Sequence, residues 1–178
     1  MRLRKRLELW KCKRGTAAVE FALVAIPFFM LLFAILEASI IYFASITLEN
    51  GMYEVARLIR TGQIAPGEDA AKQFKEALCG EVNALLSCED NLYIDVRAFS
   101  QFGGSQIPSP IVDGEFTDNT QFNPGQAGDV VLVRAYYLWD LKTPLFGPLM
   151  ANVEGGKRLL GASAAFRNEP YGSILPSS

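Results

Sequence analysis

The sequence of 178 residues contains no histidine. Without an imidazole, the chain has neither a Ser-His-Asp nor a Cys-His nucleophile, and it lacks the commonest zinc ligand. Glycine-rich phosphate loops are also missing, because the glycine pairs at 103–104 and 155–156 stand alone in stretches typical of turns. Paired carboxylates such as Glu89 and Asp90 are available for acid–base chemistry, but adjacent acids in loops are usually only solvated. We therefore expect neither an enzyme nor a metal or cofactor site.

Charged residues are absent between Phe21 and Leu36, and the apolar character resumes after Glu37. A helix over residues 21–36 spans ~24 Å. Adding the small residues at 16–19 brings the apolar run near the ~20 residues that a membrane-spanning helix needs. The sequence therefore predicts a transmembrane segment at residues 16–37.

Basic residues are concentrated before this segment. Seven of the 17 basic and one of the 19 acidic residues precede Gly15, so this leader carries +6 and the remainder −8. Basic residues beside a membrane helix tend to stay in the cytoplasm. This topology explains the leader better than nucleic-acid binding does. We expect a single-pass protein of the bacterial inner membrane with a cytoplasmic leader, 1–15, and a periplasmic domain, 38–178.

Cysteine is scarce, with three residues in the chain. Cys12 lies in the leader, whereas Cys79 and Cys88 lie in the exported part, where disulfides persist. Nine steps of straight helix would separate these two by ~13 Å, and a bonded pair needs Cα atoms within ~7 Å. A disulfide therefore requires a helix break between them, for which Gly80 or Ser87 would serve. The alternative is a two-cysteine metal site, which has no histidine or further thiol nearby, so the disulfide is favoured.

Helical periodicity continues beyond the membrane segment. Apolar residues recur at helical spacing in Met52, Val55, Ala56 and Ile59. The pattern stops at the Thr-Gly pair 61–62, which is typical of a helix end. The sequence predicts one helix from about Thr16 to Arg60, ~68 Å long and roughly twice the bilayer.

The rest of the chain predicts one further helix and three strands. The helix covers about 68–79, and the strands cover 92–99, 130–139 and 157–167, with the middle one central. The polar stretch 100–128 is either an ordinary exposed excursion or a contact surface. Because three strands need a cover, we expect the upper half of the long helix to pack on a small antiparallel sheet. The fold class is α+β, of the pilin kind.

The segment GTAAVEFAL at residues 15–23 follows the basic leader and opens the apolar run. This order resembles the processing site of type IV prepilins and the start of the TadE-like family of tight-adherence (Flp) pilus systems. The pairs at 56–57 and 61–62, the two later cysteines and the closing segment 164–171 extend the resemblance. It implies a minor pseudopilin that a prepilin peptidase cleaves between Gly15 and Thr16. The chain could equally correspond to the TadE or the TadF protein of such a system.

The resemblance also implies an assembly role for Glu20 and Phe21. Glu20 would be the fifth residue of the mature chain, where it can pair with the new amino group of Thr16 or of a neighbour and set subunit register. The other interpretation is a favourable interaction with the helix N-terminus alone. The implied partners are the prepilin peptidase, a TadF-like partner, the Flp major pilin and the inner-membrane assembly platform. A competing hypothesis is an uncleaved single-pass protein whose periplasmic domain binds a ligand or a secretion component.

Overall fold

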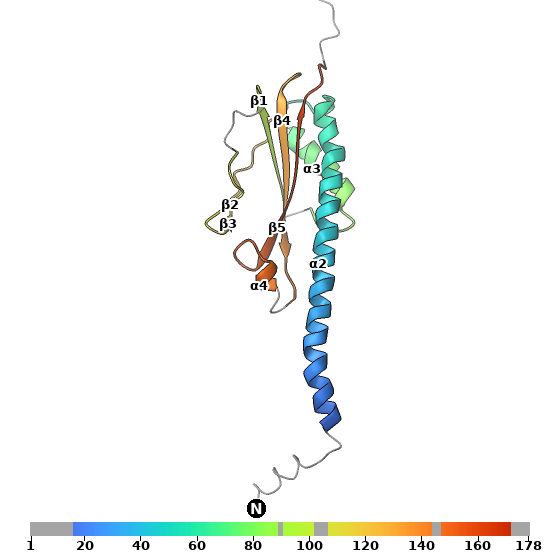
Figure 1. The fold of residues 1–178 in the computed structure, drawn as a ribbon. Coiled ribbons are helices and arrows are strands. Elements are labelled where there is room, and N and C mark those ends of the chain that lie inside the picture. Colours follow the sequence, from blue (N-terminus) through green and yellow to red (C-terminus); the bar gives the residue numbers. More distant parts are fainter. Residues whose placement is uncertain (1–15, 89–90, 102–106, 144–146, 172–178) are drawn as a thin grey trace, which may run out of the picture.

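A long helix forms one side of the molecule, and a small α+β domain lies along its upper part (Figure 1). The computed structural model describes residues 16–88, 91–101, 107–143 and 147–171. The leader, and with it Gly15, lies outside the described residues. The long helix α2 (Thr16–Arg60) has the bounds that the apolar pattern predicts. This architecture confirms the α+β fold class.

Three long strands form an antiparallel sheet with the order β1-β4-β5. They are β1 (Leu92–Phe99), β4 (Val130–Asp140) and β5 (Lys157–Arg167). β4 is central, as its β-branched and aromatic composition predicts. Its Val133 lies opposite Val96 of β1 and Ala164 of β5, so apolar side chains meet across all three strands.

The core lies between this sheet, the upper half of α2 and the second helix, α3 (Ala70–Val82). The buried residues of α2 recur every three or four positions: Ile41, Ala44, Leu48, Met52, Val55 and Ile59. Each large apolar side chain buried in this way contributes roughly 1.5–3 kcal/mol. A Cβ at Gly51 would lie 2.8 Å from Val82, so the two helices approach closely there. The predicted cover of the sheet by α2 is confirmed.

Two features of the middle of the chain differ from the sequence-based prediction. The second helix was expected to end near Cys79, but α3 continues through Gly80 to Val82. Phe74, Leu78 and Val82 form one buried stripe, and this apolar periodicity holds the helix together across the glycine. The stretch 100–128 contains a short hairpin, β2 (Ile111–Val112) with β3 (Glu115–Phe116). A further short helix, α4 (Gly147–Met150), lies between β4 and β5.

A charged network lies on the sheet face opposite α2. Asp95 is 1% exposed and accepts hydrogen bonds from Arg97 and Arg134 and from the backbone N–H of Gln121, the last at 3.0 Å. Burial alone raises the pKa of Asp95, but these donors together lower it below the ordinary aspartate value. The network therefore stabilises the ionised carboxylate and ties two strands to the segment before β4.

The C-terminal segment closes over the end of α2. Gly62 has a φ of +75°, and a Cβ there would lie 2.5 Å from the ring of Tyr171. The backbone N–H of Glu169 donates to the carbonyl of Arg60 at 2.9 Å, and the two side chains form an ion pair at 3.3 Å. Glycine suits this helix end because it accepts the left-handed conformation and leaves room for the tyrosine ring.

Candidate functional site

The lower half of α2 is bare. From Thr16 to Leu36, no residue of the helix is buried, whereas the upper half packs on the domain (Figure 1). Large apolar side chains are exposed here, with Phe21 at 71% and Leu23 at 70%. The helix is long and apolar enough to cross a membrane. A continuous apolar surface of this size is stable only against lipid or another protein.

The residues predicted for assembly lie at the free end of this bare half. Glu20 and Phe21 are both exposed on α2, and Glu20 stands one turn, ~6 Å, above Thr16. A carboxylate on an apolar helix is costly in lipid unless a cation or hydrogen-bond donor meets it. Residues 16–20 are all exposed, and the folded domain lies along the upper part of α2 (Figure 1), so a partner for this carboxylate has to come from the helix terminus or from another molecule.

Glu37 is the first buried residue along α2 and marks the change from the bare half to the packed half. It is 8% exposed. One carboxylate oxygen accepts the backbone N–H of Lys142, and the other accepts that of Thr143 at 2.9 Å. Two consecutive amides aimed at one carboxylate form a small anion site. The end of the β4 segment is therefore hydrogen-bonded to the helix at the predicted membrane boundary.

Sequence reasoning placed Glu37 at the boundary but did not find these partners. They lie 105 and 106 residues further along the chain, and both are backbone groups. Because any residue carries such an amide, no side-chain pattern indicates the contact.

The exposed apolar surface of α2 extends beyond Glu37. Tyr42, Phe43 and Tyr53 are 52–70% exposed on the side of the helix that the sheet leaves uncovered. Ordinary surface helices place polar residues on such a face. The face therefore continues the bare half upward and is suited to contact with a partner protein.

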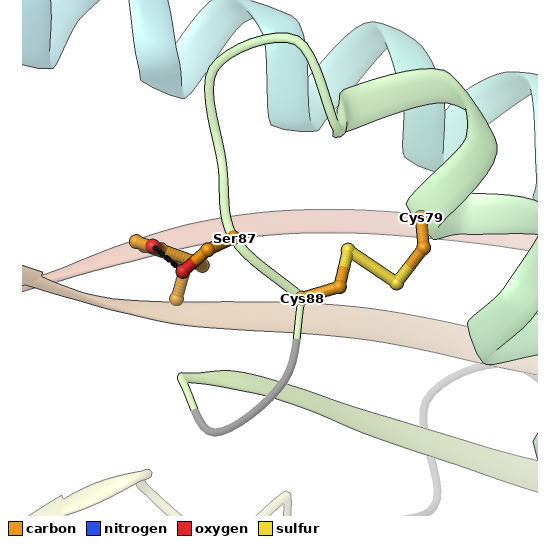
Figure 2. The surroundings of a disulfide bond; sticks show 4 residues. Cys79, Ser87 and Cys88 are labelled. Atoms are coloured by element: carbon orange, nitrogen blue, oxygen red, sulfur yellow. Dashed lines mark hydrogen bonds between the residues drawn. A yellow bond between two sulfur atoms is a disulfide. The ribbon is translucent and has the colours of Figure 1, made fainter.

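Figure 2 shows the disulfide between Cys79 of α3 and Cys88 of the segment before β1. Their Cα atoms are 5.8 Å apart, which is an ordinary distance for a bonded pair. The chain does break between them as required, but the break follows Val82 and not Gly80. Beside the bond, the hydroxyl oxygens of Ser87 and Tyr137 are 3.5 Å apart, which connects this segment to β4.

No cluster of three or more histidine, cysteine or acidic residues that could hold a metal occurs within the described ranges. The two later cysteines are bonded to each other.

A membrane-length helix that carries a small sheet on its upper half and leaves its lower half bare is the arrangement expected of a single-pass membrane protein. Residues 15–57 match the family model described as TadE-like protein. This match confirms the predicted resemblance to the TadE-like family over the first part of the chain, which includes most of α2. Comparison with curated proteins and with solved structures finds no match.

Proposed function

We propose that this protein is a minor pseudopilin required for assembly of a Tad (Flp) type IV pilus. A prepilin peptidase cleaves it between Gly15 and Thr16, and α2 then packs with the helices of other pilins. The observation that carries the proposal is the bare apolar half of α2 with Glu20 one turn above Thr16. A permanently anchored periplasmic protein has no need for a carboxylate at that place.

Cleavage gives Glu20 a partner. It creates a positive amino group on Thr16, within reach of a carboxylate one helical turn away or on a neighbouring subunit. Such a pair is stronger in a low dielectric than in water, and an unpaired member is penalised. Pairing between subunits would fix their axial stagger, with Phe21 packed in the same helix contact.

The charge distribution supports a cytoplasmic leader and a periplasmic domain. The leader carries +6 and everything after it −8, which follows the positive-inside tendency. The disulfide Cys79–Cys88 agrees with an oxidising compartment for the domain. Residues 38–178 would then be periplasmic, and residues 16–37 would cross the inner membrane.

A folded domain on the upper half of the helix supports a minor role. A major fibre subunit of a single helix would expose α2 all round, whereas here the sheet covers one side. The uncovered side, with Tyr42, Phe43 and Tyr53, is the surface we assign to pilin partners. The candidates for binding this surface are a TadF-like partner, the Flp major pilin and the assembly platform. Which of them binds would decide whether this protein sits at the base or at the tip of the fibre.

The test combines three variants in a host with an intact pilus locus. Gly15→Trp should block cleavage and piliation, because the peptidase requires a small residue before the bond. Glu20→Ala should be cleaved normally and yet yield few or no pili. Glu76→Ala is the control, since Glu76 is an exposed acid on α3 and not on the α2 face assigned to partners, and it should leave both readouts unchanged. Normal pili from Glu20→Ala would refute the registry role, and normal pili from an uncleaved Gly15→Trp would favour an anchored protein that binds a ligand or secretion component.

A further inference from the structure

A groove runs between α2 and the lower end of β4, and its position along the helix relates it to the membrane boundary. It has a volume of about 530 Å³, and its lining residues are Met30, Phe33, Leu36, Glu37, Ile40, Trp139, Asp140, Lys142 and Thr143. Met30 and Ile40 stand ~21 and ~36 Å above Thr16 along the helix axis. Since the hydrocarbon core of a bilayer is ~30 Å thick, the groove straddles its far boundary.

The walls and the rim of the groove differ in character. The α2 wall is apolar apart from Glu37, whose two oxygens are occupied by backbone amides. The rim carries Trp139, an amphipathic side chain typical of the membrane interface. It also carries Lys142, whose side chain is 81% exposed and 4.0 Å from Asp140. The carboxylate of Asp140 has a second cation, Lys157, at 3.5 Å. An apolar floor with a lysine on its rim is complementary to a phospholipid, because a lysine can rest its stem on apolar surface and place its ammonium beside a phosphate.

A second observation comes from α4. This short helix lies at the same lower end of the domain (Figure 1), and its Leu149 is 80% exposed. A large apolar side chain this exposed suits contact with a membrane surface. The lower end of the domain therefore presents apolar groups toward the bilayer at two places.

The position of the groove favours a hydrocarbon chain of the bilayer as its occupant. The groove is also continuous with the lipid-facing residues Met30 and Phe33, so a chain of the surrounding leaflet can enter it sideways.

We propose that this groove holds one acyl chain of a phospholipid from the leaflet that faces the folded domain, with Lys142 beside the headgroup phosphate. The bound lipid holds the folded domain against the membrane surface. The proposal rests on the membrane span of α2 and not on pilus assembly, so it stands or falls separately from the proposed function.

The two tryptophans of the chain make the test direct. Trp10→Phe leaves Trp139 as the sole tryptophan. The full-length variant is placed in vesicles of phosphatidylcholine and phosphatidylglycerol, with or without bromine on the acyl chains. Bromine quenches an indole within contact distance, so we expect loss of Trp139 emission in the brominated vesicles. Adding Ile40→Phe should fill the groove and restore emission, whereas the matched Ile35→Phe, on an exposed residue outside the groove, should not.

Three outcomes would overturn the proposal. Emission that is insensitive to bromine would show that no acyl chain reaches the groove. Equal quenching with Ile40→Phe would show that Trp139 only rests on the membrane surface. Quenching that appears only when protein is diluted in lipid would assign the groove to a second copy of the chain.

A measurement on the unaltered protein does not depend on the folding of any variant. Native mass spectrometry of the full chain extracted in mild detergent should show one phospholipid bound per chain. Its absence would count equally against the proposal.

Discussion

The contact of Glu37 with the amides of Lys142 and Thr143 makes a sharp prediction about local stability. Replacing Glu37 by alanine removes two charge-assisted hydrogen bonds, each worth about 1.5–3 kcal/mol. The lower end of this range applies, because the released amides belong to a partly exposed segment and can bind water. We therefore expect a loss of about 3 kcal/mol in the free energy that holds this segment to α2, which corresponds to a roughly 100-fold change in its opening equilibrium.

Amide hydrogen exchange in detergent micelles or nanodiscs measures this opening. In Glu37→Ala, exchange at Lys142 and Thr143 should accelerate by about two orders of magnitude. Exchange at Val133, in the buried centre of β4, should not change, because the core above is held by apolar packing. Glu49→Ala, an exposed acid on the same helix, is the control for hydrogen exchange. Unchanged exchange at the two amides would refute the proposed role of Glu37, and equal acceleration at Val133 would show that its effect is global.

Three further predictions concern the stability of the folded domain, each measured by denaturant unfolding in a fixed detergent. The double variant Cys79→Ser/Cys88→Ser should lose roughly 2.7 kcal/mol, the chain-entropy value for a loop of about ten residues, and a reductant should then have no further effect. Asp95→Asn should cost about 3 kcal/mol at neutral pH because it leaves buried guanidinium groups without their carboxylate. The pKa of Asp95 is lower in the folded state than in the unfolded state. Its contribution to stability is therefore complete at a pH above the unfolded-state pKa and is lost as the pH falls through the folded-state pKa. The loss of stability in acid should accordingly be shallower in the variant. Gly128→Ala should cost about 1–2 kcal/mol from its positive φ alone, and Gly62→Ala clearly more because its methyl group also meets a ring; equal costs would refute the account of that contact.

Features with a local pattern were predictable from the sequence. The start and end of α2 follow from an apolar run that begins after a basic leader and from a helical stripe that stops before Gly62. β1 and β5 have the predicted bounds, because alternating residues such as those around Val96 and Ala162 define both a strand and its buried face. The placement of Glu20 and Phe21 on an exposed apolar helix follows in the same way.

Features that depend on distant or very short segments were not predictable. The partners of Glu37 are backbone amides more than a hundred residues away. Asp95 occupies a position that alternation assigns to the outer face, and it is buried only because the segment before β4 folds over that face. The two-residue strands β2 and β3 are too short to form a period. The break between the cysteines falls after Val82 and at neither Gly80 nor Ser87, the two predicted positions, since the apolar stripe ending in Val82 outweighs the helix-weakening effect of one glycine.

The central claim is that this chain is processed as a pilin. The most direct measurement is the intact mass and N-terminal residue of the protein recovered from membranes of a host with an active pilus locus. The account predicts a chain that begins at Thr16, with Glu20 as its fifth residue. A chain that still begins at Met1, while the peptidase cleaves its other substrates, would contradict the account and leave a permanently anchored periplasmic protein.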